Sequence, residues 1–222
     1  MRGERIRLTN GDSVMSVLGK LASSHHRTDE VLNQQLAQEI ARTKDSAAIC
    51  ELVDHLASSS KDVASDCIKV LYEVGALEPE LIAEYVDVFI VLLNNSNNRL
   101  VWGAMTALGA ITHLTADEIW PQIDTVIHAT DIGSAITQDW GVRVLAVVSA
   151  KDSTYEAHIF PFLTNFIKEC RPKDVPRYAE SMLIAINETN RGDILPILEA
   201  RKVVLRTAAL KRLEKVIQKI KQ

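Results

Sequence analysis

Glycine and proline are scarce in this chain, with 9 and 6 residues among 222. A β-sandwich or β-barrel needs many tight turns, so this scarcity argues against both architectures. Aromatic residues make up only 5% of the chain, whereas hydrophobic residues reach 47%. We therefore expect a core of leucine, isoleucine, valine and alanine, which suit close packing of helix against helix.

Long apolar runs are also missing. The longest, Val88–Leu93, is far shorter than the roughly 20 residues of a membrane helix, so no membrane span is expected. Residues 10–12 interrupt the sequence after the charged N-terminus, which argues against a signal peptide. The three cysteines, Cys50, Cys67 and Cys170, form no CxxC pair. We expect them to be reduced, small apolar core residues of a cytoplasmic protein.

Motifs that carry chemistry are absent as well. The sequence has no GxSxG, no phosphate-binding glycine loop and no GxGxxG. None of the six histidines belongs to an HxxxH or HExxH pattern, and His25-His26 stands beside Arg27 in a polar segment typical of solvated loops. The sequence therefore predicts no catalytic residue, no cofactor, no metal ligand and no enzymatic activity.

Positive charge is scarce in the middle of the chain. Residues 28–200 hold twelve lysines and arginines against twenty-six acids. Residues 1–27 hold five against two, and residues 201–222 hold eight against Glu214 alone. The overall net charge is −4. An acidic body with basic ends has no general attraction for nucleic acid or an anionic membrane.

What the chain does contain is an internal repeat, with a spacing of roughly 35 to 40 residues. One recurring feature is an aromatic residue followed by a small one within an apolar helical pattern. It occurs at Trp102-Gly103, Trp140-Gly141 and Tyr178-Ala179. A Cβ at Gly103 or Gly141 would push crossing helices apart, so these glycines predict close helix contacts. This spacing is typical of stacked helical units that cannot bury their apolar faces alone.

The second recurring feature is a proline between apolar residues, at Pro121, Pro161 and Pro196. The segments Thr115–Glu118 and Ser153–Glu156 have the spacing of helix-capping boxes, a few residues before two of these prolines. Two interpretations are open. Either each helix is kinked at its proline, or a short turn comes first and the helix begins at the proline.

These motifs resemble the HEAT-repeat family, with armadillo repeats a close neighbour. Val101–Ile111 is similar to the first helix of that family's repeat, and the segment from Val204 to Val216 is similar to it again. The proline-bearing segments resemble the second helix. The resemblance implies an all-α, right-handed α–α superhelix (a HEAT-like solenoid) of about five helix pairs, with a tendency to bind proteins and sometimes nucleic acid. It implies no catalytic residues.

The same patterns give a domain organisation. Residues 1–11 are expected to form an N-terminal arm, and residues 12–222 a single HEAT-like solenoid whose first helix runs from about 12 to 23. Repeats are clear over about 60–203, and a basic capping helix is expected over about 203–220.

That last segment is the main candidate site. Its basic residues predict contact with an anionic partner: Arg201, Lys202, Arg206, Lys211, Arg212, Lys215 and Lys219. The alternative interpretation is a solvated helix that covers the apolar face of the last repeat, since cations also favour helix C-termini.

The sequence thus predicts a non-enzymatic scaffold that binds another protein. An alternative is a nucleic-acid-associated module that uses the basic C-terminal helix. A further alternative is the function of the DNA-alkylation-repair glycosylases with HEAT-like folds. In that case the glycosylase site would include Asp139, Trp140 and Arg143. The acidic centre argues against it, because phosphate binding needs many lysine and arginine contacts.

Overall fold

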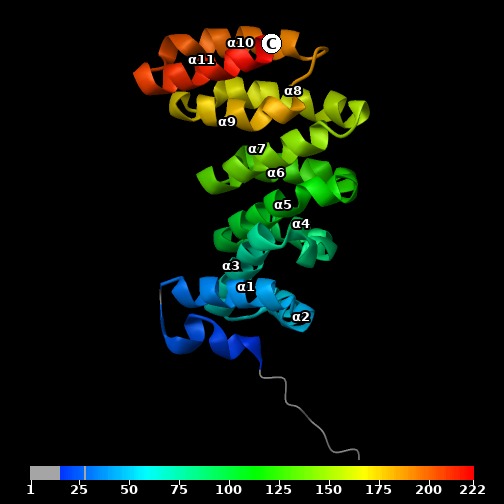
Figure 1. The fold of residues 1–222 in the computed structure, drawn as a ribbon, viewed down its shortest axis with the longest axis vertical. Helices are drawn as coiled ribbons and strands as arrows, with labels where there is room; N and C mark the ends of the chain where they lie inside the picture. The colour runs from blue at the N-terminus through cyan, green and yellow to red at the C-terminus, as the bar shows by residue number, and fades with distance from the viewer. Residues whose placement is uncertain (1–15, 28) are drawn as a thin grey trace, which may run out of the picture.

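In the computed structural model, which describes residues 16–27 and 29–222, helices are stacked in two rows along one axis (Figure 1). Within these ranges there is no strand, so the predicted all-α class is confirmed. One row comprises α1 (Val31–Thr43), α3 (Lys61–Leu77), α5 (Asn98–Ile119), α7 (Ala135–Ser149), α9 (Val175–Met182) and α11 (Thr207–Lys221). The other comprises α2 (Ser46–Asp54), α4 (Val86–Leu92), α6 (Ile123–Ile132), α8 (Ser153–Glu169) and α10 (Arg191–Arg201).

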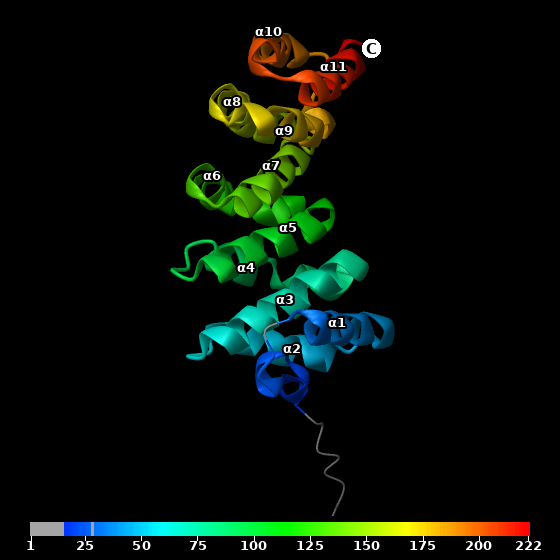
Figure 2. The ribbon, with the colours of Figure 1, turned by 90° about the vertical axis from the view of Figure 1, so that its left-hand side faces the viewer.

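The two rows curve together. Along the first row, each helix packs against its neighbours, α3 against α5, α5 against α7, and α7 against α9. Pairing between the rows joins α4 to α5, α6 to α7, and α10 to α11. In Figure 2 the row of α3, α5, α7, α9 and α11 lies on the inside of the bend. We call it the inner row, and the row of α2 to α10 the outer row. Over the residues that the structure describes, the chain is thus a solenoid of five helix pairs with α1 added at one end, as predicted.

An aliphatic core runs the length of the stack. Leu71, Leu108, Leu145, Leu163 and Leu213 are all fully buried in it. The predicted close contacts are present, since a Cβ at Gly103 would overlap Ile68 and one at Gly141 would overlap Thr130. Within the described ranges, no helix is both long and apolar enough to cross a membrane.

The three prolines divide between the two interpretations that the sequence left open. Pro121 lies in a short 3-10 turn, η6 (Trp120–Gln122), and α6 begins directly after it. Pro161 and Pro196 instead lie inside α8 and α10. Both are exposed, so the backbone groups that each proline leaves unpaired can be solvated.

Neither predicted capping box forms as expected. Helix α8 is capped one residue earlier, by Asp152, whose carboxylate accepts the Thr154 N–H at 2.7 Å. Thr115 does not begin a new helix but marks a kink within α5, with φ −123° and ψ 24°. Its hydroxyl donates to the Ile111 carbonyl at 3.1 Å, so it serves the preceding turn instead of the following one.

The two ends of the chain differ from expectation. The predicted arm over 1–11 and the start of the helix expected from 12 lie outside the described residues. Where that helix should continue there are two 3-10 turns, η1 (Val17–Lys20) and η2 (Ser23–His25). The Ser24 hydroxyl donates to the Leu18 carbonyl at 2.6 Å, which is the local competition that disfavours a helix.

At the other end, α11 begins at Thr207 and not near 203. A 3-10 turn, η9 (Lys202–Val204), and the extended residue Leu205 precede it. Val204 is 54% exposed and does not belong to the apolar stripe of α11. The cysteine prediction is right for Cys67, which is buried, and wrong for Cys50, which is exposed.

Candidate binding surface on the inner helix row

The inner row carries a depression lined only by its own helices. This cavity of about 340 Å³ lies across α5, α7, α9 and α11, and we call it the inner groove. It is lined by Gly109, Trp140, Arg143, Val147, Arg177, Glu180, Ser181 and Arg212. Because it spans four stacked helices, it suits a ligand that extends along the solenoid axis.

The floor of the groove is the indole of Trp140. The ring lies against the backbone of α5, where a Cβ on Gly109 would overlap it. Arg143, one turn further along α7, places its guanidinium carbon 4.9 Å from the centre of the indole. Residues three apart share a helix face, so their spacing produces this pair. Arg143 is exposed and has no ion pair within the described part of the chain, so its charge is available to a ligand.

The other two arginines of the groove are held by carboxylates. Arg177 Nη2 lies 2.7 Å from Asp139 Oδ1 and 3.0 Å from Asp174 Oδ1. Burial raises the pKa of Asp139, outweighing the attraction of Arg177. Arg212 Nε donates to Glu180 Oε1 at 2.7 Å, and this hydrogen bond lowers the pKa of Glu180. These pairs tie α7 to α9 and α9 to α11, and they leave Arg143 as the unneutralised cation of the groove.

The cation–aromatic pair of α7 recurs on three other helices of the inner row. Lys69 lies 4.9 Å from the Tyr72 ring centre on α3, and Arg99 lies 5.5 Å from the Trp102 ring on α5. On α9, Arg177 lies 5.2 Å from the Tyr178 ring. The sequence revealed the recurring aromatics, but of their cations we considered only Arg143 beside Trp140, and we did not predict that the pairing recurs. The signal was present, since Arg99 stands three residues before Trp102 and Arg143 three after Trp140.

At the N-terminal end of the row the cations are neutralised. Lys69 Nζ lies 2.9 Å from Glu30 Oε2 and 2.6 Å from Glu73 Oε1, and Arg99 Nη2 lies 2.8 Å from Glu30 Oε1. Burial acts to lower the pKa of Lys69, but hydrogen bonds with Glu73, Tyr72 and Glu30 outweigh it and raise that pKa. The hydrogen bond from Lys69 lowers the pKa of Glu30. This network links α1, α3 and α5.

The basic residues predicted near the C-terminus do not form one site. Arg201 donates to the carbonyls of Lys168, at 2.7 Å, and Cys170. Lys202 lies 3.2 Å from Glu199, and Arg212 belongs to the inner groove. These three are therefore engaged within the molecule.

The remaining four predicted residues are exposed, without an ion pair among the residues that the structure describes. They are Arg206, Lys211, Lys215 and Lys219. Lysines at 211, 215 and 219 are four residues apart and so follow one another along a face of α11. Whether they bind an anionic partner stays a prediction.

Comparison with known proteins places the fold. No family model and no curated relative matches the sequence. Among solved structures, an engineered protein is similar with a TM-score of 0.65 and 16% identity, over 93% of this chain and 96% of that one. A designed armadillo repeat protein in complex with the peptide (KR)4 is similar with a TM-score of 0.62 and 14% identity, over 84% and 86%.

A third similar structure belongs to computationally designed armadillo repeat proteins for modular peptide recognition. Its TM-score is 0.62 and its identity 14%, over 91% of this chain and 98% of that one. The chain therefore has the right-handed α–α superhelix fold of armadillo- and HEAT-like repeat proteins.

Proposed function

We propose that this protein is a non-enzymatic helical-repeat scaffold that binds another protein through the inner groove. The observation that carries the proposal is the exposed Arg143 guanidinium over the Trp140 indole, in a groove that crosses four helices. Tryptophan and arginine are the side chains most enriched among the energetically dominant residues of protein interfaces.

The shape of the groove supports an extended segment as the bound element. The helices of the inner row repeat, so a peptide running along them meets a similar surface at each step. Two of the similar structures concern peptide recognition or a bound peptide. A non-catalytic role is supported by the pairing of Asp139 with Arg177 and of Glu180 with Arg212, because both carboxylates are engaged in salt bridges.

The test is selection of short random peptides on the immobilised protein, followed by affinity measurements on individual peptides. We expect Arg143→Glu to lower the affinity of selected peptides at least about tenfold, as expected for a dominant interface residue. The matched control is Arg42→Glu, the same charge reversal at an exposed position of α1 that does not line the groove, which should leave affinity unchanged. An equal loss of peptide affinity in both variants, or no loss of affinity in either, would contradict the proposal.

A second function, binding of nucleic acid, is favoured by one observation. Lys211, Lys215 and Lys219 project from α11 without intramolecular ion pairs in the described structure. Three or four phosphate contacts give only weak binding that falls steeply with salt. We rank this function second, because the acidic body opposes such binding over the rest of the surface.

A further inference from the structure

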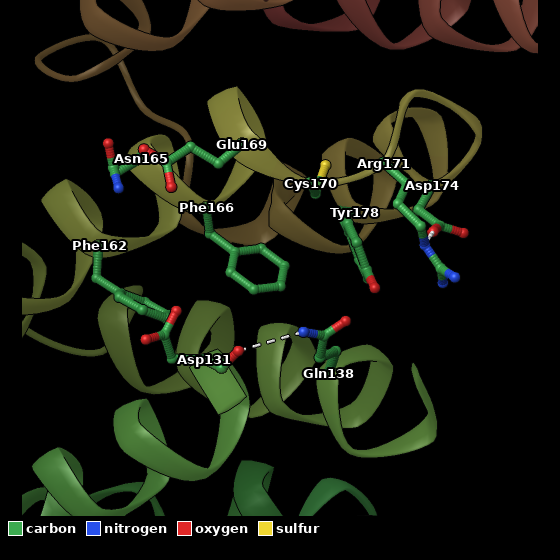
Figure 3. A pocket seen from close by; sticks show the side chains of 10 residues that line it. All are labelled: Asp131, Gln138, Phe162, Asn165, Phe166, Glu169, Cys170, Arg171, Asp174 and Tyr178. Atoms are coloured by element: carbon green, nitrogen blue, oxygen red, sulfur yellow. Dashed lines mark hydrogen bonds and ion pairs between the residues drawn. The ribbon is translucent and has the colours of Figure 1, made fainter. Parts of the chain in front are cut away.

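A second cavity, of about 390 Å³, lies between α6 and α7 on one side and α8 and α9 on the other (Figure 3). Three aromatic rings form its wall. The ring centres of Phe162 and Phe166 are 5.8 Å apart, and Phe166 meets Tyr178 edge to face at 5.2 Å. Phe162 and Phe166 are four residues apart on α8 and so share one face, which Tyr178 of α9 continues. We call this cavity the aromatic pocket.

The Tyr178 hydroxyl is a buried polar group directed into this pocket. The residue is only 1% exposed, and its oxygen makes no hydrogen bond of good geometry within the described structure, although the Asp139 carboxylate and the Arg177 guanidinium lie beside it. In Figure 3 the hydroxyl points toward Gln138, whose Nε2 donates one hydrogen bond to the Asp131 carbonyl at 3.3 Å. Burial raises the pKa of Tyr178 to about 12, so the hydroxyl stays neutral and can accept a hydrogen bond. Buried polar groups of this kind normally have a partner.

The charge at the pocket is negative. Asp131 and Glu169 line it, are exposed, and have no ion pair among the described residues. Asp174 also lines it but is neutralised by Arg171 and Arg177. Two free carboxylates beside aromatic faces attract a cation both by charge and through the ring quadrupoles.

The kind of cation follows from the lining. A metal ion is disfavoured, since no group of three or more histidine, cysteine or acidic side chains in the described ranges is placed to hold one. Aromatic walls instead suit an apolar stem that ends in a positive charge. A guanidinium is planar, stacks on rings and is weakly hydrated, and its N–H groups can donate to the Tyr178 oxygen, whereas an ammonium is a compact and strongly hydrated charge.

We propose that the aromatic pocket binds an arginine side chain of the protein partner. This inference rests on the proposed function, because the partner is the one that occupies the inner groove. Arg177 connects the two sites, since it lines the inner groove and lies over the Tyr178 ring. A segment bound in the groove can therefore place a neighbouring arginine in the pocket.

The test uses a probe small enough to enter the pocket alone. Nα-acetyl-arginine methylamide is titrated into the 222-residue protein and followed by NMR, through the Gln138 side-chain amide and the Phe162 and Phe166 ring protons. The neutral isostere, the citrulline derivative, is titrated in parallel. We expect the arginine probe to shift these signals, and the citrulline probe to bind at least about tenfold more weakly, because charge is the main attraction.

Two variants locate the binding. Tyr178→Phe removes the hydroxyl and keeps the ring, and Glu169→Gln removes one exposed charge. Each variant is expected to lower the affinity for the arginine probe severalfold. Because Glu169 is exposed, the second variant tests the pocket even where the first affects folding. Glu188→Gln, an exposed position away from the pocket, is the matched control and should bind as the parent does. Equal binding of both probes, or shifts confined to other residues, would overturn the inference.

The same peptides that test the groove separate the two proposals. If selected peptides respond to Arg143→Glu but lose nothing when their arginines become citrulline, the aromatic pocket is excluded and the scaffold function stands. If the arginine probe binds as described but no selected peptide responds to Arg143→Glu, the pocket stands and the groove function fails. A lysine probe that binds more tightly than arginine would contradict the guanidinium assignment.

Discussion

The Trp140 indole of α7 occupies the space where the missing Cβ of Gly109 would lie on α5. The contact brings the two helices close and at the same time positions the floor of the inner groove. One glycine therefore links the packing of the solenoid to the surface proposed to bind a partner.

Gly109→Ala tests this link. Glycine in a helix costs about 1 kcal/mol relative to alanine, so the substitution would stabilise the protein if space allowed. Here the new methyl overlaps the Trp140 ring, and overpacking of this kind typically costs about 1–3 kcal/mol. We expect a net loss of stability in urea unfolding, together with a shift of tryptophan fluorescence.

The chain offers its own control for that substitution. Gly192 lies near the start of α10, and apart from its chain neighbours and the adjacent backbone of its own helix no atom lies within 4 Å of the position of an added Cβ. Gly192→Ala should therefore leave stability unchanged or raise it by a few tenths of a kcal/mol up to about 1 kcal/mol. If both variants were equally stable, the close contact at Gly109 would not be structurally important.

Lys69 is predicted to hold the N-terminal end of the inner row together. Its side chain is only 5% exposed and contacts the carboxylates of Glu30 and Glu73. Lys69→Met keeps the apolar stem but leaves both carboxylates without their shared cation, at an expected cost of about 1–3 kcal/mol at neutral pH. Lys211→Met, at an exposed position without an ion pair in the described structure, should change stability by less than about 0.5 kcal/mol.

The same variant makes a prediction about pH. Because the pKa of Glu30 is lowered in the folded state, its interaction stabilises the fold above its ordinary pKa of 4.5 and is lost as the pH falls below that value. The difference in unfolding free energy between the parent and Lys69→Met should therefore shrink in acid. A difference that stays constant down to about pH 3 would show that packing of the lysine stem, and not its charge, is responsible.

Much of the fold follows from apolar spacing in the sequence, because each helix must bury one face. The recurrence of Trp102, Trp140 and Tyr178 marked successive helices of a single row, and the structure has them on α5, α7 and α9. The cap of α8 was misplaced by one residue because Asp152 and Ser153 are both competent caps, and only the backbone conformation at Asp152 decides between them. The box at Thr115 was wrong because the Thr115 hydroxyl bonds back to the Ile111 carbonyl within α5. The 3-10 turns over 17–25 were missed because the Ser24 hydroxyl bonds to the Leu18 carbonyl, a local contact that competes with helix formation.

The site was harder to predict than the fold. Sequence counting grouped Arg201, Lys202 and Arg212 into one basic surface, yet the first binds carbonyls, the second pairs with Glu199 and the third enters the groove. These interactions depend on which acceptors the stacked helices place nearby. Contacts between neighbouring repeats leave no pattern in the local sequence, so they could not be predicted from it. The unpartnered hydroxyl of Tyr178 is a property of the packed structure alone.

The pair of Glu180 and Arg212 provides a weaker test of electrostatics. The hydrogen bond from Arg212 lowers the pKa of Glu180, so its contribution is present above the ordinary pKa of 4.5 and disappears as the pH falls. Both side chains are more than a third exposed, and pairs of this kind contribute only about 0.2–1 kcal/mol. We expect Glu180→Gln to lower the free energy of unfolding by that amount at neutral pH and low salt. In acid or in high salt the free energy of unfolding of the variant should equal that of the parent. A loss that persists at high salt would mean that Glu180 stabilises the fold by packing.

Lysines 211, 215 and 219 separate the two functions considered for this protein. Their replacement by glutamine removes three exposed charges, so stability should change by less than about 0.5 kcal/mol per site. Because none of the three lines the inner groove, binding of selected peptides should be unaffected. Any weak binding of a fluorescent oligonucleotide should instead fall, and the slope of log affinity against log salt should flatten by about 0.7–0.9 for each phosphate that the variant no longer neutralises. Peptide affinity that collapses in this triple variant would move the protein-binding surface from the groove to α11, whereas oligonucleotide binding that survives it would remove α11 as a nucleic-acid site.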